Sequence, residues 1–506
     1  MSEVVSWFRW SWRQLTSMRV AIFLLLALAL AAMPGSLVPQ RAQNPEKVAE
    51  FLETYPRLGP VLDTLGFFNV YSSVWFSAIY LLLFISLIGC ILPRTRELYR
   101  SLTSPPVRIP SRLSRFESYR RIEVSESDDV IAGLAKRLKG RYRVKRFDDG
   151  LSAERGHLKE IGNLLFHYAL VGILVSFAWG QLATYRGQAI VIEGRGFANA
   201  LVDYDSFESG AWFSESDLRP FSFTLDAFAS SFAPSGRPES FRADVTVREP
   251  DASGAMAERR EVITPNHPIE AGDTAITLSG NGFAPIIRVT DAEGKVAFDG
   301  PVPFIPQDAA YTSRGVIKVP DVSKGLDQIG FSGIFMPAAG QSDGTWASAH
   351  PSLIQPLLVL DVWHGNLGLD EGVPRNAYEL HTDELTQVSD DTGTPYAIQL
   401  APGQTAEIPG GLGTIEFRDL TRFGSFDVRH DPSLMWLLIS TVSAIGGLCI
   451  SLFVPRRRLW VRTSTLAGTT VIEAAALSRG DDAGLDGELD WLLAELPAPD
   501  PRHEEN

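Results

Sequence analysis

The sequence predicts an integral membrane protein with four transmembrane α-helices, a large extracytoplasmic all-β domain (sandwich or barrel-like) and a small cytoplasmic βαββ domain. Three observations support this fold class. Four apolar runs are each close to the roughly 20 residues that cross a bilayer. Basic residues gather beside particular ends of these runs. In the longest polar segment, short runs of alternating apolar and polar residues, which are typical of strands, are separated by turn residues.

The four apolar runs contain no Asp, Glu, Lys or Arg, and they are Val20–Val38, Val74–Leu92, Ile161–Leu182 and Leu434–Val454. The first run is followed by "PGSLVPQ" rather than by the small-residue A-x-A site at which signal peptides are cleaved. We therefore expect the first run to remain in the protein as a membrane span.

The charges that flank the runs predict the orientation of the chain. Segment 93–160 carries 17 Lys and Arg against 10 Asp and Glu, whereas segment 183–431 carries 17 basic and 35 acidic residues. Because positively charged loops stay in the cytoplasm, we expect both termini and segment 93–160 to be cytoplasmic. The net charge of −14 thus averages a basic inner surface and an acidic exterior, which would attract a basic partner or simply keep the outer domain soluble.

These observations divide the chain into nine segments. They are a cytoplasmic N-terminus (1–19), the first span (20–38), an outer loop with amphipathic helices (39–73), the second span (74–92), the basic βαββ domain (93–160), the third span (161–182), the outer β-rich domain (183–431), the fourth span (432–454), and a basic anchor followed by an acidic disordered tail (455–506).

The outer domain is predicted to be all-β because it contains short runs, such as "FRADVTVRE" and "PLLVLDVW", in which apolar and polar residues alternate. Gly, Pro, Asn or Asp bound these runs. In the acidic tail, only "GELDWLLAEL" has the pattern of an amphipathic helix. The chain has two cysteines, Cys90 and Cys449, and no C-x-x-C motif. We therefore expect the cysteines to pack in the membrane rather than to exchange electrons.

The motifs of common soluble enzymes are absent from the sequence, including a P-loop, H-E-x-x-H, an EF-hand loop and C-x-x-C-H. Of the eight histidines, only His167 lies within an apolar run. An ionisable side chain inside the membrane costs free energy and usually faces a partner, a cavity or a ligand. Asn163 is one turn earlier on the same face of the helix, where it could determine which imidazole nitrogen is free.

Three hypotheses for His167 remain open at this point. It could form a hydrogen bond between two helices, as polar residues in membrane proteins often do. It could be the axial ligand of a haem iron, because a neutral imidazole suits iron and a porphyrin suits an apolar environment. A proton relay is the third hypothesis, and the lack of a carboxylate within the four runs weakens it.

Other candidates lie at the ends of the spans. His430 precedes the fourth span at its outer mouth, where it could contact haem or a substrate, although helix-capping residues account for the positions that follow it. Arg94, Arg155 and Arg456 flank the inner ends of spans and could pair with haem propionates. Anchoring by positively charged inner loops also accounts for these arginines.

Five stretches occur in a distinctive order. They are "SMRVAIFLLLALALAAMPGSLVPQ", "YSSVWFSAIYLLLFISLIGCILPRT", "GHLKEIGNLLFHYALVGILVSFAWG", "NHPIEAGDTAITLSGNGFAPIIRV" and "RHDPSLMWLLISTVSAIGGLCISLFVPRRRLWVR". In order, spacing and topology over roughly residues 12–462, the chain resembles the ResB/CcsB family of system II cytochrome c biogenesis proteins.

The resemblance implies a cell-membrane subunit that works with a ResC/CcsA-type protein, whose Trp-rich haem-handling segment is absent from this chain. Together they would bind b-type haem transiently, move it outward and present it to apocytochrome c for covalent attachment. The family's third-span histidine is implicated as a haem axial ligand and corresponds to His167. The role of Asn163 in orienting this histidine is expected from helix spacing alone. The chain alone is not expected to be an enzyme but a subunit of a holocytochrome c synthase complex.

A second hypothesis assigns the chain a different role. In this hypothesis the acidic outer domain is a scaffold or chaperone that holds apocytochrome c, while the partner binds all of the haem. The visible spectrum of the chain with and without the His167 side chain would separate the two hypotheses.

Overall fold

The computed structural model describes residues 2–41, 43, 45–124, 130–342, 345–369, 378–389, 393–466, 469–478, 482–494 and 496. The described residues form two compact units. One, which we call the bundle unit, comprises Met1–Trp179 and Ser433–Asn506. The other, the β unit, is Gly180–Pro432.

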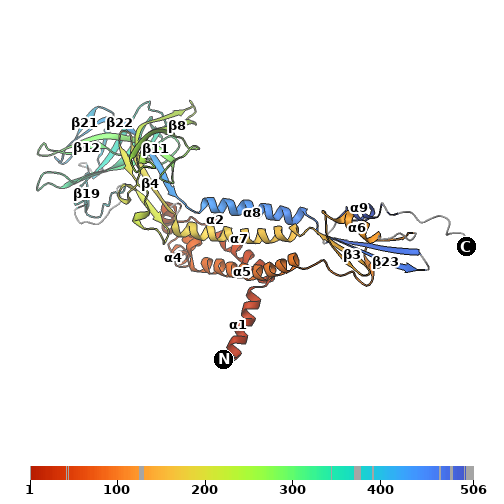
Figure 1. Ribbon diagram of the computed structural model, residues 1–506. Helices are drawn as coiled ribbons and strands as arrows, with labels where there is room; N and C mark the ends of the chain where they lie inside the picture. The colour runs from red at the N-terminus through yellow and green to blue at the C-terminus, as the bar shows by residue number, and fades with distance from the viewer. Residues whose placement is uncertain are drawn as a thin grey trace. The chain divides into compact units, whose positions relative to one another are not determined.

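Long apolar helices dominate the bundle unit. Four helical segments of the described chain are long and apolar enough to cross a membrane, namely Met18–Leu37, Gly59–Thr103, Leu158–Ala183 and Leu434–Phe453. They contain the helices α2 (Met18–Leu37), α5 (Val74–Thr103), α7 (Leu158–Ala183) and α8 (Leu434–Phe453), which run side by side in Figure 1. Serine side chains begin two of them, because Ser17 accepts a hydrogen bond from the Val20 amide and Ser73 from the Phe76 amide.

Several helix boundaries differ from the predicted spans, since α2 begins at Met18 rather than Val20 and α7 at Leu158 rather than Ile161. Helix α5 continues past the apolar run to Thr103 because the residues after Pro93 remain helical in a polar, arginine-containing stretch. Helix α8 begins at Leu434 with Ser433 at its N-cap, two residues later than expected. Before the bundle, the chain forms helix α1 (Ser2–Leu15).

The connection between α2 and α5 is short and helical. It comprises α3 (Pro45–Thr54), α4 (Gly59–Thr64) and the 3₁₀ turn η1 (Phe67–Ser72), with a break between α3 and α4 at the Tyr55–Pro56 step. Gln40 joins the two ends of the connection. Its side-chain amide donates to the carbonyls of Val38 and Phe67 at 3.0 Å each and accepts from the Val70 amide at 3.0 Å. The Pro-Gln pair after the first span therefore has a structural role.

Helices α7 and α8 approach closely at glycines. A Cβ atom at Gly447 would lie 2.6 Å from the Phe166 amide nitrogen and 2.8 Å from the Gly162 carbonyl oxygen. A Cβ at Gly162 would lie 2.6 Å from the Ile450 side chain. Farther along, a Cβ at Gly172 would lie 2.5 Å from the Ser440 hydroxyl. Small residues thus allow the two backbones to pack against each other, as is common between membrane helices.

The bundle unit also contains a β-sheet whose strands precede α7 and follow α8 in the sequence. We call this sheet the terminal sheet. Its strand order is β1-β24-β23-β3-β2, all antiparallel. The strands are β1 (Ser118–Val124), β2 (Arg143–Phe147), β3 (Gly150–Arg155), β23 (Arg457–Leu466) and β24 (Thr469–Ser478). The 3₁₀ turn η2 (Leu113–Arg115) precedes β1, and helices α6 (Val130–Leu138) and α9 (Leu485–Leu493) pack on the sheet.

The terminal sheet corrects two sequence predictions. The predicted βαββ domain of 93–160 is not a self-contained sheet, and the segment 455–506 is not simply an anchor and a disordered tail. Instead, β23 and β24 are the central strands, and α9 contributes Leu489 and Leu492 to the core. The expected helix in the tail is present as α9. Residues 497–506 lie outside the described part of the chain.

Buried ion pairs connect α9 to the sheet. Arg457 donates to both carboxylate oxygens of Asp482, at 2.6 and 2.7 Å, and also pairs with Glu488. Glu488 accepts a second hydrogen bond from Arg155 at 2.8 Å. The side chains of Arg457, Asp482 and Glu488 are 11%, 9% and 10% exposed, so these charges compensate one another away from solvent.

The β unit is built around one long sheet. Its strands are β4 (Tyr185–Ile192), β6 (Ser206–Ser209), β10 (Ile269–Ala271), β11 (Thr274–Asp291), β12 (Val296–Pro301), β21 (Gln404–Ile408) and β22 (Gly413–His430). One end of this sheet packs on a second sheet of β5 (Gly196–Ala198), β7 (Ser222–Phe232), β8 (Pro238–Pro250) and β9 (Met256–Ile263).

The other end of the long sheet packs on a third sheet. This sheet contains β13 (Ile305–Pro306), β14 (Ser313–Val319), β15 (Gln328–Met336), β18 (Leu357–Gly365), β19 (Leu385–Gln387) and β20 (Ala397–Leu400). The remaining elements are the hairpin β16 (Ala339–Ser342) and β17 (Thr345–Ser348) and the 3₁₀ turns η3 (Leu201–Asp203) and η4 (Glu215–Asp217). Shifts of register in the β11–β22 ladder, between Leu278 and Gly280 and between Ile286 and Ile287, allow these two strands to serve both cores.

Paired strands flank α7 and α8 in the sequence. Strands β3 and β23, which precede α7 and follow α8, pair directly, with Arg155 opposite Arg457. Strands β4 and β22, which follow α7 and precede α8, also pair, with Tyr185 opposite His430. Both ends of the helix pair therefore continue into hydrogen-bonded ladders.

We expect Gly447→Ala to lower the stability of the chain in detergent by about 1–3 kcal/mol, because the new methyl group must displace the α7 backbone. The neighbouring Gly446→Ala is the matched control, since a Cβ there has no described atom within 4 Å. Thermal unfolding of the two variants measures the difference. Equal transition temperatures would mean that α7 and α8 do not pack through this glycine.

We expect Arg457→Ala to cost about 3 kcal/mol of local stability, because it leaves the Asp482 and Glu488 carboxylates buried without their partner. Hydrogen exchange of the β24 and α9 amides measures this loss. Arg121→Ala, which removes an exposed pair with Glu123, should change the exchange by less than about 0.5 kcal/mol. Arg457 also lowers the pKa of Asp482, so its stabilising effect should be present near neutral pH and disappear as Asp482 becomes protonated in acid. Unchanged exchange in Arg457→Ala would contradict this role.

Candidate functional site

His167 lies in the first half of α7, nine residues after the helix begins at Leu158. Its Nδ1 atom is 2.7 Å from the backbone carbonyl oxygen of Asn163, one turn earlier. A carbonyl oxygen only accepts hydrogen bonds, so this contact requires the proton to be on Nδ1. Nε2 then carries the lone pair of a neutral imidazole.

Asn163 therefore acts differently from the sequence expectation. The sequence placed its side-chain amide beside the imidazole, but the contact with His167 is made by its backbone carbonyl. Any residue at position 163 would present this carbonyl as long as α7 remains helical. The identity of the asparagine side chain is not what determines the tautomer in this structure.

In the described part of the chain, the ring of His167 has one hydrogen bond. Among the described residues, neither ring nitrogen is bonded to another helix. The Phe166 ring contacts the imidazole edge to face, with centroids 5.2 Å apart and planes at 84°. The imidazole is only half-buried in the bundle. The hypothesis that His167 joins two helices through a hydrogen bond thus has no contact to support it within the described chain.

The neighbours of His167 show which way it faces. The Phe166 backbone lies against Gly447 of α8, and the Tyr168 hydroxyl is 3.0 Å from the Thr95 hydroxyl of α5. Because successive residues of a helix are rotated by about 100°, position 167 lies about 100° around α7 from each of these two positions.

The residues near the start of α7 form a compact ionic cluster. Glu154, with a side chain 6% exposed, accepts from Arg458 at 3.0 Å and lies 3.6 Å from Arg456 and 3.7 Å from His157. Arg456 also pairs with Glu160. Burial, assisted by Arg456 and Arg143, lowers the pKa of His157 and favours its neutral form.

The three arginines that could bind haem propionates have different partners in the structure. Arg456 and Arg155 are engaged by carboxylates of the chain itself, Glu160 and Glu488 respectively. Arg94 contacts the Met18 sulfur at 2.8 Å. The structure therefore favours the structural explanation for Arg155 and Arg456.

His430 ends β22, in the β unit, and its ring is also held by a backbone carbonyl. Its Nδ1 is 2.8 Å from the Asp273 carbonyl oxygen, which leaves Nε2 as the unprotonated nitrogen. The ring stacks on the fully buried Tyr185, with centroids 5.3 Å apart and planes at 22°. Sequence reasoning singled out His430 but missed Tyr185 and Asp273, because only strand pairing and a left-handed turn residue bring them beside it.

The two cysteines differ in burial, because Cys90 is partly buried and Cys449 is exposed. Cys90 lies beside the Thr16 carbonyl oxygen at 2.9 Å, and both Cys90 and Cys449 are free thiols. Within the described ranges, His, Cys, Asp and Glu form no group of three that could hold a metal ion. A metal centre with several protein ligands is therefore not supported, and a single imidazole must be judged as an axial ligand.

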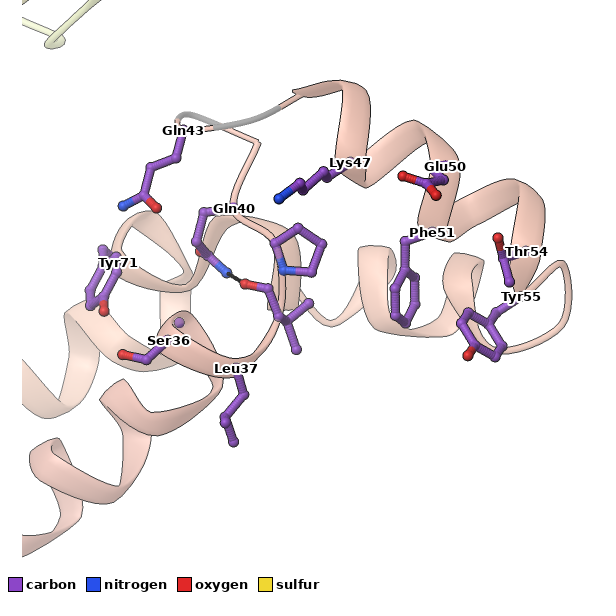
Figure 2. Close-up of a pocket in the computed structure, with 13 residues that line it drawn as sticks. Ser36, Leu37, Gln40, Gln43, Lys47, Glu50, Phe51, Thr54, Tyr55 and Tyr71 are labelled. Atoms are coloured by element: carbon purple, nitrogen blue, oxygen red, sulfur yellow. Dashed lines mark hydrogen bonds between the residues drawn. The ribbon is translucent and has the colours of Figure 1, made fainter. Parts of the chain in front are cut away.

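A surface cavity of about 900 Å³ lies between the end of α2, helix α3 and η1. Figure 2 shows Gln43, Lys47 and Glu50 on its polar side and Phe51 and Tyr55 on its aromatic side. Its lining contains neither histidine nor cysteine, so it offers no nitrogen or thiolate to iron. Gln40, also in its wall, is already bonded to the backbone.

Comparison with known proteins identifies relatives over most of the chain. A family model described as the ResB-like family matches residues 18–490. A "Cytochrome c biogenesis protein CcsB" from Synechococcus sp. (strain WH7803) is 32% identical over 261 residues, which cover 50% of this chain and 56% of the relative. A protein of the same name from Synechococcus sp. (strain JA-3-3Ab) is 28% identical over 410 residues, covering 75% of this chain and 77% of the relative.

The alignment with the first of these relatives spans little more than half of that protein's length. The family match is much longer, and it includes α2, α5, α7, α8 and the terminal sheet. It therefore confirms the resemblance seen in the order of the membrane motifs: this chain belongs to the ResB-like family.

Proposed function

We propose that this chain is a membrane subunit of system II cytochrome c biogenesis that binds haem through His167 and, with a ResC/CcsA-type partner, delivers it across the cell membrane to apocytochrome c. The observation that carries the proposal is the orientation of one imidazole. Nδ1 of His167 is bonded within its own helix, so Nε2 is available to a ligand.

The chemistry of this position suits a haem iron. Iron accepts a neutral imidazole nitrogen as an axial ligand, and the porphyrin favours an apolar environment such as the faces of α7 and α8. The hydrogen bond to the Asn163 carbonyl has two effects on His167: it selects the tautomer and restricts rotation of the ring. The chain would thus hold the iron in a fixed place, while the partner supplies the remaining ligands and the attachment chemistry.

The strand pairing supports the proposed topology. Because β3 and β23 are in one ladder, the start of α7 and the end of α8 must lie on the same side of the membrane. The pairing of β4 with β22 imposes the same condition on the opposite ends of these helices. Both conditions are met if α7 and α8 each cross the membrane once between the two ladders. With the basic flanks inside, the terminal sheet and both termini would be cytoplasmic and the β unit extracytoplasmic.

His430 is a second candidate contact with haem or with the substrate. Its ring is fixed by Asp273 and Tyr185, and its tautomer matches that of His167. It would act where the chain enters α8, at the outer surface in the proposed topology. The alternative function, an apocytochrome c scaffold that does not bind haem, draws on the acidic β unit and predicts that neither histidine affects the haem content.

We expect His167→Ala to reduce the haem that copurifies with the chain and its partner by roughly tenfold or more, since loss of residues that only orient a metal ligand already costs 10–100-fold. The Soret absorbance per complex measures the haem content. Added imidazole should restore the absorbance by occupying the space of the lost side chain.

Tyr168→Phe is the matched control, because it alters the adjacent residue and removes only the contact with Thr95. It should retain the haem content of the unaltered chain. If His167→Ala also retains its full haem content and supports cytochrome c maturation, the proposed function is wrong and the scaffold alternative is favoured.

We expect Asn163→Ala to leave the haem content within about twofold of the unaltered complex, because the backbone carbonyl that accepts from His167 is retained. The same Soret measurement, made beside His167→Ala, tests this expectation. A loss as large as that of His167→Ala would show that the asparagine side chain itself contributes to the site.

A further inference from the structure

Helix α1 has an unusual concentration of tryptophan and arginine. Its sequence is "SEVVSWFRWSWRQL", and its three tryptophans, Trp7, Trp10 and Trp12, are 65%, 56% and 51% exposed. Large aromatic side chains are rarely left in water to this extent next to one another. Trp and Arg are, however, the side chains that favour the boundary between lipid and water.

Trp7, Trp12 and Leu15 lie on one side of α1 and the two arginines on the other, with Trp10 one turn after Ser6 at the edge of the basic side. Ser11 has Trp7 one turn before it and Leu15 one turn after it, which places it on the apolar side. Ser6 has Arg9 and Arg13 at the following two turns, which places it on the basic side. At 100° per residue, Ser6 and Ser11 are about 140° apart around the helix.

The depth of α1 is set by its attachment to α5. The Ser86 hydroxyl donates to the Leu15 carbonyl at 2.5 Å, and the Cys90 thiol lies 2.9 Å from the Thr16 carbonyl. A Cβ at Gly89 would lie 2.1 Å from the Thr16 side chain, so the turn after α1 is pressed against α5. The apolar run of α5 ends at Leu92, which places this turn roughly 3–9 Å inside the end of the run at 1.5 Å per residue.

The direction of α1 agrees with this depth. The chain turns at Thr16 and Ser17 and then enters the span α2, and Figure 1 shows α1 leaving the side of the bundle rather than extending it. A helix that leaves a bundle sideways at this level runs along the membrane surface. Amphipathic helices in the interface bury their apolar side 5–10 Å into the boundary region.

We propose that α1 lies in the plane of the membrane, in the leaflet at which α2 begins, and binds anionic phospholipid. Trp7 and Leu15 are on the side directed to the acyl chains, and Arg9 and Arg13 are directed to the headgroups. The positive charge of the arginines complements anionic headgroups in particular. This assignment does not depend on haem binding or on a partner protein.

The test uses the purified full chain in lipid nanodiscs, without other proteins. Cys90→Ser, which keeps a donor toward Thr16, and Cys449→Ala remove the native thiols. A nitroxide is then attached at Ser11→Cys or, as the matched control, at Ser6→Cys. Each label is exposed to oxygen, which concentrates in lipid, and to a water-soluble nickel complex. The rates of collision with these two reagents report whether the label is in lipid or in water.

We expect the label at position 11 to collide mainly with oxygen and the label at position 6 mainly with nickel. Equal exposure of both labels to nickel would overturn the proposal, because α1 would then be in water. Protection of both labels from both reagents would also overturn it, because another part of the chain would then cover the helix.

The basic side is tested by Arg9→Gln combined with Arg13→Gln. In nanodiscs that contain phosphatidylglycerol, the ratio of membrane-bound to free α1 should fall by roughly fivefold for each arginine removed, the equivalent of about 1 kcal/mol per charge. In discs of phosphatidylcholine alone the same change should have little effect. Equal effects in both lipids would overturn the assignment of anionic phospholipid.

Discussion

The close contact of α7 with α8 is the constraint on which the rest of the structure depends. Gly162 and Gly447 bring the two backbones together, and antiparallel ladders continue from both ends of the helix pair. Sliding one helix past the other would disturb the register of the β3–β23 ladder, which belongs to the same unit. The helices therefore behave as one element, and His167 is held on that element rather than on a loop.

This constraint also explains how a polar ring can be placed among apolar side chains. A polar group in hydrocarbon must find its hydrogen bonds inside the protein. His167 satisfies Nδ1 with a carbonyl of its own helix, so it needs no polar partner from α8 or α5. The helix pair can then pack through glycine and small residues, and in the function proposed above the remaining ring nitrogen would bind the haem iron.

Sequence reasoning recovered the features that depend on local pattern. Uncharged apolar runs predicted the four long helices, and alternating runs predicted the large β-rich region. The terminal sheet was missed because its central strands, β23 and β24, follow β1, β2 and β3 only after about 300 intervening residues. Moreover, β24 contains "EAAALS", whose residues favour a helix when they are considered alone. Tertiary pairing with β1 and β23 determines the strand.

The candidate site was recovered only in part for a similar reason. The position of His167 is evident from the sequence, but the sequence does not reveal whether Asn163 contributes its side chain or its backbone, since both are one turn away. The environment of His430 depends on the β4–β22 ladder and on the left-handed backbone of Asp273. Neither feature can be predicted from a local sequence motif.

The order of strands in the terminal sheet has a consequence for biosynthesis. Strands β1, β2 and β3 are made early, but the second neighbour of β3 is complete only at Leu466 and the neighbour of β1 only at Ser478. Until then their unpaired edges are open to aggregation, which makes protection by chaperones valuable during translation. A chain whose fourth helix failed to insert could not bring β23 and β24 to them.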